Sequence, residues 1–266
     1  MAWLAERVRQ VAYPAAGVAV LLLAWHVAAV ASWVPSYLLP EPLKVAASIW
    51  RTTLDGTLWM HLKPTLQATV VGYVAGSLVA ILLAALVAEF KWVERALLLH
   101  LLALQSIPKV SVAPLVFLWL GFDIGGKVLL VGLICFFPVF ANALAGFRAA
   151  DPNLIDLMRA AGAGRAHIWW HVKLPGAFSP IFAGLEVSVA FALIGCVVME
   201  FIGATRGMGF MIQDASNTFD LALSLSAVII LGLVGLFGNA LVRIARARML
   251  FWEGDRGAGV VGSSHV

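Results

Sequence analysis

Six long runs of apolar residues divide this chain, and the segments between them carry most of its charged residues. The runs are Val11–Trp33, Leu66–Ala88, Ala96–Leu120, Lys127–Phe147, Ile181–Ile202 and Leu221–Ile244. Each is long enough to cross a bilayer as a helix, which takes about 20 mostly apolar residues. Because backbone polar groups cannot stay unpaired in lipid, runs of this kind must be helical. The pattern predicts an all-α integral membrane protein with six transmembrane helices.

The composition supports a membrane location. Of the 266 residues, 62% are hydrophobic and only 12% are charged, whereas about a quarter of the residues in soluble domains are charged. A soluble domain of this length could not hide so much apolar surface. The first apolar run has no small-residue cleavage signal at its end, so it is interpreted as a retained anchor rather than a signal peptide.

The basic residues predict the orientation in the membrane. If the N-terminus is cytoplasmic, twelve of the eighteen Lys and Arg residues fall on the cytoplasmic side, as the positive-inside rule requires. Both termini then lie in the cytoplasm. The expected organisation is an N-terminal helix with an outer segment (1–64), a core of five transmembrane helices (65–245) and a flexible cytoplasmic tail (246–266). No clustered basic face indicates nucleic-acid binding.

Two connecting segments have helical periodicity of their own. On the outer side, Leu43–Leu54 alternates apolar and polar residues and lies near Trp50 and Trp59, which predicts a helix along the membrane interface. On the inner side, the connection 148–176 is long enough to suggest a function. It begins with Asp151 and Pro152, residues typical of a helix start.

The inner connection is predicted to be a helix, a glycine turn and a second helix. Leu154, Leu157, Met158 and Ala161 recur at helical spacing, Gly162 and Gly164 interrupt the pattern, and a short amphipathic segment follows until Pro175 stops it. From the residues alone, the segment could equally be a re-entry loop that lies along the lipid headgroups. Trp169 and Trp170 would suit that position.

The same connection resembles the EAA loop of permeases in ABC importers, whose pattern is E-A-A-x3-G-x9-I-x-L-P. Aligned on the ending Leu174-Pro175, the glycine of the pattern falls on Gly162, followed by Ala163. The acidic position falls on Asp156, with Leu157 and Met158 at the two alanines. The spacing matches the family, whereas the EAA letters do not, and Asp156 carries the charge on a shorter arm than glutamate.

Two further stretches are similar to permeases that import nitrate, sulfonates, taurine and pyrimidine precursors. One is Ile107–Gly121, with Phe136–Pro138 and Gly146–Arg148 after it. The other runs from Glu200 through Gly207-Met208-Gly209 to Ile212. The resemblance covers about residues 66–244. It is specific for the permease class and weak for the substrate.

The resemblance implies a type I ABC importer permease in a bacterial inner membrane. Such a permease pairs with a second permease copy, here expected to be a homodimer, and docks a cytoplasmic ATPase that binds ATP and Mg²⁺. A periplasmic binding protein delivers the substrate, and this chain binds no cofactor itself. The resemblance assigns the ATPase-coupling loop to a set of residues that also includes two arginines: Asp156, Leu157, Met158, Arg159, Gly162, Ala163, Arg165, Leu174 and Pro175.

Ionisable residues within apolar runs are candidates for the translocation path, because such residues are costly in a bilayer. Lys109 follows Pro108, where a helix can kink, and could attract an anion. Glu200 lies at the outer end of the fifth run, near Gly203. Each has a structural alternative: Lys109 could extend to the interface or pair with a glutamate, and Glu200 could be an interface residue. A Lys109–Glu200 pair would reconcile a glutamate with an anionic substrate.

Other functions have weaker support in the sequence. Gly121–Lys127 spells G-x4-G-K, but Val128 stands where a phosphate-binding loop needs Ser or Thr. His167 and His171 are spaced for a metal but lack a third ligand. A clustered catalytic set is also missing, which disfavours an enzyme. A self-contained secondary transporter stays the alternative, although paired broken helices and acidic relays are not evident.

Overall fold

A computed structural model describes residues 2–31, 35, 38–121 and 123–251, and the regular structure in these ranges is helical. In chain order, the elements are α1 (Ala2–Val30), α2 (Pro42–Leu54), α3 (Thr57–Glu89), α4 (Lys91–Gln105), the 3-10 turn η1 (Lys109–Val112), α5 (Ala113–Leu120), α6 (Ile124–Arg148), α7 (Pro152–Ala160), α8 (Arg165–Ile168), the π-helical turn η2 (Trp169–Lys173), α9 (Leu174–Gly203), α10 (Met208–Asn217) and α11 (Leu221–Met249).

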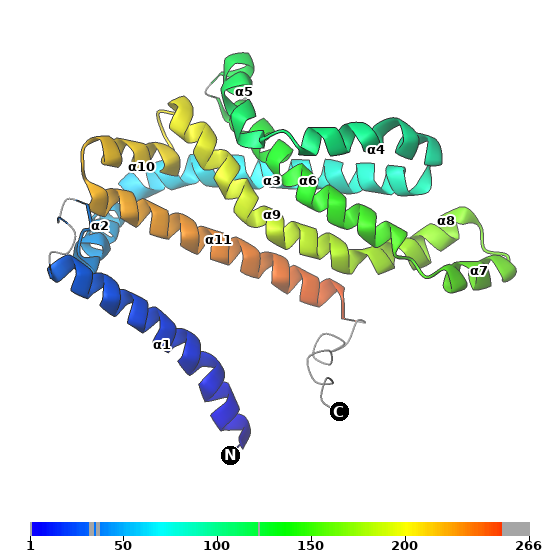
Figure 1. Cartoon of the computed structure of the whole chain (residues 1–266), viewed down its shortest axis with the longest axis horizontal. Helices are drawn as coiled ribbons and strands as arrows, with labels where there is room; N and C mark the ends of the chain where they lie inside the picture. Colours follow the sequence, from blue (N-terminus) through cyan, green and yellow to red (C-terminus); the bar gives the residue numbers. More distant parts are fainter. Residues whose placement is uncertain (1, 32–34, 36–37, 122, 252–266) are drawn as a thin grey trace.

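The core of the molecule is a bundle in which α6 packs along both α3 and α9, with α11 against α9 (Figure 1). Small residues bring α3 and α6 together: a Cβ atom on Gly76 would lie only 2.6 Å from the Cα of Gly132. Such contacts are typical of membrane helices, where close backbone approach replaces the hydrophobic effect as the source of packing energy. The Gly72-x3-Gly76 motif therefore serves packing within the chain.

Four of the six predicted spans are confirmed as helices of membrane-crossing length and hydropathy: Thr57–Glu89, Ile124–Arg148, Arg165–Gly203 and Leu221–Met249. The predicted first span corresponds to α1, in which Ala16–Val30 is an apolar helical segment. Trp33, the predicted end of that span, lies outside the described residues. The structure thus supports four or five spans among the described residues, and the count of six stays a prediction.

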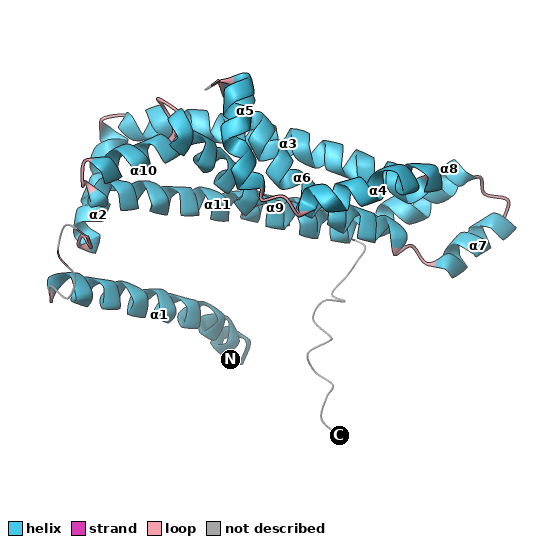
Figure 2. Cartoon of the chain, turned by 45° about the horizontal axis from the view of Figure 1, so that its top comes forward, coloured by secondary structure: helices cyan, strands magenta, loops and turns pink. Residues whose placement is uncertain are grey.

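The expectation of one helix over Ala96–Leu120 is wrong. The chain forms α4 and then η1 with α5, and the two parts are bent by 90°. The break falls at Ser106–Pro108, because proline has no N–H to donate and its ring excludes the preceding helical turn. As a result, α4 lies beside α3, whereas α5 projects from the bundle (Figures 1 and 2).

The bundle has two structurally different ends. At one end, α3 passes into α4 and the α7–α8 segment extends beyond α6 and α9 (Figure 2). At the other end, α2 and α10 pack beside the start of α11 and the start of α3. The predicted outer helix is confirmed as α2, with Val45 buried and Trp50 exposed. The expected boundaries at residues 64 and 245 both fall inside helices, α3 and α11.

Candidate functional site

Local sequence signals fix both ends of α7. The side chain of Asp151 accepts a hydrogen bond from the backbone N–H of Asn153 at 2.9 Å, and Pro152 occupies the first helical position. This is the predicted helix start, in which the cap satisfies an otherwise unpaired N–H group.

Gly162 ends α7 in a left-handed conformation, with φ of 83°. The N–H of Gly162 donates to the carbonyl of Arg159 at 2.9 Å, and that of Ala163 donates to the carbonyl of Met158 at 2.9 Å. This pair of bonds is the Schellman motif, which favours glycine at the left-handed position. The predicted glycine turn is therefore confirmed. The left-handed conformation also explains why the EAA-loop pattern has a glycine at the position of Gly162.

The surface of α7 is free of contacts that would bury it. None of its residues is buried, and the side chains of Leu154 and Leu157 are 42% and 66% exposed. Asp156 pairs with Arg159 at 3.0 Å within the helix, and both side chains are largely exposed. Leu154 and Leu157 thus form a small exposed apolar patch on a capped helix, a feature that is found at protein-binding surfaces.

The segment after α7 forms one continuous helix with the membrane span that follows. The predicted second helix is present and begins at Arg165 as α8, but Pro175 does not stop it. Instead, η2 widens the preceding turn, so that the N–H of Leu174 donates to the carbonyl of Trp169. The π-helix is rare and occurs mostly as single turns of this kind within α-helices, often at functional sites. Leu174 and Pro175 thus lie in the first turn of α9.

Packing ties this continuous helix to the bundle. Ile168 and Val172 are buried, and the ring of Trp169 stacks on Phe147 with centroids 6.1 Å apart. Lys173 forms a salt bridge with Glu89 at the end of α3. Because α8, η2 and α9 form one unbroken rod, a force on the exposed α7–α8 segment can act directly on a membrane-spanning helix.

Lys109 lies at the bend between α4 and α5. Its Nζ donates to the carbonyl of Gln105 at 3.1 Å, which the interrupted helix has left without a backbone partner. The same Nζ lies 4.5 Å from the ring centroid of Phe137 on α6, within the range of a cation–π interaction. Pro108, directly before it, is exposed at the break.

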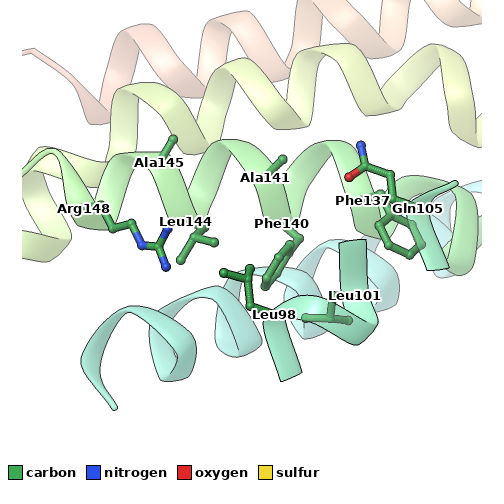
Figure 3. A pocket seen from close by; sticks show the side chains of 9 residues that line it. All are labelled: Leu98, Leu101, Gln105, Phe137, Phe140, Ala141, Leu144, Ala145 and Arg148. Carbon is green, nitrogen blue, oxygen red and sulfur yellow. The ribbon is translucent and has the colours of Figure 1, made fainter. Parts of the chain in front are cut away.

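Two neighbouring cavities lie along α6 on the side facing α4. The first, of about 450 Å³, is lined by Lys109, Gln105, Phe137 and residues of α9. The second, of about 280 Å³, shares Gln105 and Phe137 with the first and extends to Arg148 (Figure 3). Figure 3 shows apolar side chains, including Leu98, Leu101 and Phe140, between these polar positions. The two cavities follow α6 from the bend towards the α7–α8 end.

Glu200 belongs to a different, fully buried cluster at the opposite end. Its carboxylate accepts hydrogen bonds from Lys127 Nζ at 2.8 Å, from Thr65 Oγ1 at 2.9 Å and from the N–H of Gly209 at 2.8 Å. The expected pairing of Lys109 with Glu200 is wrong, because Lys127 occupies that role. The two side chains meet because they lie at the same depth in the bundle. Lys127 is in the first turn of α6, and Glu200 is in the last turn of α9, at the same end.

The turn between α9 and α10 is built around this cluster. Gly207 has φ of 139°, and a Cβ atom there would lie 2.2 Å from the Glu200 carboxylate. Its N–H donates to His61 Nδ1 at 3.2 Å, and the N–H of Met208 donates to Thr65 at 2.8 Å. Gly203 is half-buried at the end of α9. The cluster therefore holds α3, α6, α9 and α10 together.

The sequence analysis missed Lys127, Thr65 and His61 as members of this cluster. The available signal was Glu200 itself, because a carboxylate within a span requires a cation at its own depth. Lys127, which begins the predicted fourth span, meets that condition, whereas Lys109 lies in the middle of the predicted third span, at a different depth. Among the described residues, no group of three or more His, Cys, Asp or Glu side chains could hold a metal ion.

The fold defines a class: an all-helical membrane protein with several spans and an exposed helical segment, α7–α8, at one end. A family model describing the inner membrane component of binding-protein-dependent transport systems matches residues 72–251. The chain belongs to this family. It is a permease subunit of an ABC importer, is not catalytic, and works with a separate ATPase and a substrate-binding protein. This membership sets aside the self-contained secondary transporter.

The chain is similar along most of its length to permeases that are named for different substrates. It is 34% identical to the riboflavin transport system permease protein RibX of Chloroflexus aurantiacus, over 91% of each chain. It is 29% identical to the formylaminopyrimidine transport permease protein ThiX of Halalkalibacterium halodurans, over 88% of this chain and 92% of the relative. The taurine transport system permease protein TauC of Escherichia coli is 29% identical, over 93% of this chain and 92% of the relative.

Proposed function

We propose that α7 and α8 form the element through which the ATPase drives this permease. The observation that carries the proposal is a doubly capped helix with no buried residue, joined through one turn to a rod that enters the membrane. ATP-driven closure of the ATPase would displace α7, and α8–α9 would transmit the movement. The coupling set is Asp156, Leu157, Met158, Arg159, Gly162, Ala163 and Arg165, with Leu174 and Pro175 at the membrane entry.

The experiment is co-purification of the tagged permease with its partner ATPase. Leu157→Asp places a charge on the exposed apolar face of α7, and Asp156→Lys reverses the charge of the Asp156–Arg159 pair. Both variants are expected to release the ATPase. Because that ion pair is largely exposed, its own loss should cost little stability. Gly162→Pro, which cannot adopt the left-handed conformation, is expected to act in the same way.

The matched control is Ala160→Gln, on the polar face of the same helix, where a good helix former is exposed to solvent. It should retain the ATPase. If all the variants retain the ATPase as well as the wild type does, α7 is not the docking element.

We further infer that the substrate passes along the α6 cavities between two permease copies, with Lys109 and Pro108 at the bend. The supporting observation is an ammonium with no carboxylate partner among the described residues, at a mostly apolar cavity of about 450 Å³. Such a lining suits a small organic or inorganic anion, of the sulfonate, taurine or nitrate class, more directly than it suits a neutral pyrimidine or flavin. Glu200 and Gly203 take a supporting role, since Glu200 is already neutralised by Lys127.

The path proposal is tested by uptake into proteoliposomes that contain the complete transporter. Taurine, methanesulfonate, nitrate and riboflavin form the panel of substrates. For an anion that the wild type imports, Lys109→Ala should slow uptake about tenfold, the effect of one charge-assisted contact. Lys109→Arg should retain most of the uptake, and Lys63→Ala, an exposed lysine at the start of α3, serves as the control. If the Lys109→Ala variant imports the anion at the wild-type rate, Lys109 does not contact the substrate on its path.

A further inference from the structure

A third cavity, outside the proposed path, lies where α3 meets the α8–η2 segment. It measures about 600 Å³ and is an open groove on the side of the bundle. Leu82, Leu86 and Phe90 form one wall, and Trp169 and Trp170 form the other. Trp170 is 60% exposed and Phe90 is 44% exposed, so the groove presents a large apolar surface that nothing in the described chain covers.

The groove crosses the boundary between the hydrocarbon and the polar part of the membrane. Between Lys63 and Glu89, α3 has no charged residue, so Glu89 marks the level at which the span leaves the apolar layer. Leu82 lies seven residues before Glu89, which corresponds to about 10 Å along a helix. The deep half of the groove therefore lies in the hydrocarbon, where a water-soluble protein cannot reach. The other half lies at the level of the lipid headgroups, where tryptophans are typical.

The charge at the rim is positive and uncompensated. Glu89 is already engaged by Lys173, and Arg165, which lines the groove, has no ion pair among the described residues. An apolar cleft that ends at an unpaired guanidinium is complementary to a molecule with an acyl chain and a phosphate. The cleft would hold the acyl chain, and arginine forms bidentate hydrogen bonds with phosphate oxygens.

From this geometry we propose that the groove is a binding site for one anionic phospholipid. Its phosphate contacts Arg165, and one acyl chain lies between Leu82, Leu86 and the indoles of Trp169 and Trp170. The site rests on the membrane orientation of the proposed function but not on ATPase docking by α7. Because the lipid contacts the same rod that carries α8 into α9, its presence would support the position of the coupling segment.

The test measures retained lipid on the permease–ATPase complex. The purified complex is exchanged into micelles that contain equal amounts of phosphatidylglycerol and phosphatidylcholine with identical acyl chains, and bound lipids are counted by native mass spectrometry. The wild type is expected to retain phosphatidylglycerol in preference to phosphatidylcholine. Arg165→Ala should reduce retained phosphatidylglycerol about tenfold, the loss expected for one charge-assisted contact. Trp170→Ala should reduce both lipids.

The matched control is Arg243→Ala, since Arg243 is exposed on α11 and also has no ion pair among the described residues. It should retain phosphatidylglycerol as the wild type does. Equal retention by Arg165→Ala and the wild type would overturn the proposal, as would an equal loss in Arg243→Ala, which would indicate general attraction to anionic lipid.

Two further arms separate the alternatives. If Arg165→Ala keeps phosphatidylglycerol but releases the ATPase, the groove is part of the protein interface and the lipid proposal fails. Leu157→Asp should release the ATPase while retaining the lipid, so failure of the docking proposal is distinguishable from failure of the lipid site. Excess inorganic phosphate should not displace the phosphatidylglycerol, because the acyl chain holds the lipid in the groove.

Discussion

At the scale of single residues, the carboxylate of Glu200 depends on Lys127 for its charge balance. Both side chains are buried, and their atoms lie 2.8 Å apart. Removing one member of a buried ion pair leaves the other charge without compensation, whereas replacing both removes the problem. The hydrogen bonds from Thr65 and Gly209 to Glu200 add to the cost of any change at this position.

The corresponding prediction concerns the free energy of unfolding. Lys127→Met should destabilise the permease by about 3–5 kcal/mol, the typical cost of breaking a buried pair. The double variant Lys127→Met/Glu200→Gln should recover part of this loss. Thermal unfolding in detergent provides the measurement, with Lys44→Met, which breaks the exposed Lys44–Glu41 pair, as a control that should change little. Additive effects of the two buried substitutions would contradict the prediction.

At the scale of elements, α7 and α9 differ in what stabilises them. α7 is held by its own caps, Asp151 and Gly162, and buries nothing. α9 is held by packing against α6, α3 and α11. A short helix without tertiary contacts is marginally stable in water, so α7 should open locally far more often than α9 does.

Hydrogen–deuterium exchange should detect this difference. In the isolated permease, the backbone amides of residues 155–160 are expected to exchange much faster than those in the middle of α9. Binding of the ATPase should then slow exchange in α7, because the partner buries its apolar face. The amides of α10, at the other end of the bundle, are the internal control and should not respond. Unchanged exchange in α7 on complex formation would argue against docking at this element.

At the scale of the whole molecule, the two ends of the bundle carry different chemistry. The α7–α8 end has basic residues on several elements, including Lys91, Arg148, Arg165 and Lys173. The α2–α10 end contains the buried Glu200 cluster instead. By the positive-inside rule, these basic residues predict that the first end lies in the cytoplasm, the side on which the ATPase is expected to bind α7.

Cysteine labelling tests this orientation. Asn153→Cys and Asp55→Cys place exposed thiols at the two ends of the bundle. In intact cells with a permeable outer membrane, a membrane-impermeant maleimide should label Asp55→Cys but not Asn153→Cys. The wild-type chain serves as the blank, because Cys135 and Cys196 are both fully buried. Labelling at position 153 and protection at position 55 would reverse the orientation.

Features that depend on neighbouring residues could be predicted from the amino-acid sequence. Apolar runs specified the four long helices, and Asp151, Pro152 and Gly162 specified the ends of α7, because caps act within one helical turn. The spacing around Gly162 and Pro175 also indicated the permease class, which the family match confirmed.

Contacts between distant residues, in contrast, became evident from the folded chain. Glu200 pairs with Lys127, 73 residues away, rather than with Lys109, because partner choice depends on the depth at which each helix begins and ends. The 90° bend after α4 and the passage of α8 through a π-helical turn into α9 were likewise undetermined by local pattern. Proline permits a stop, a kink or a continuation, and the packing of the surrounding helices selects among them.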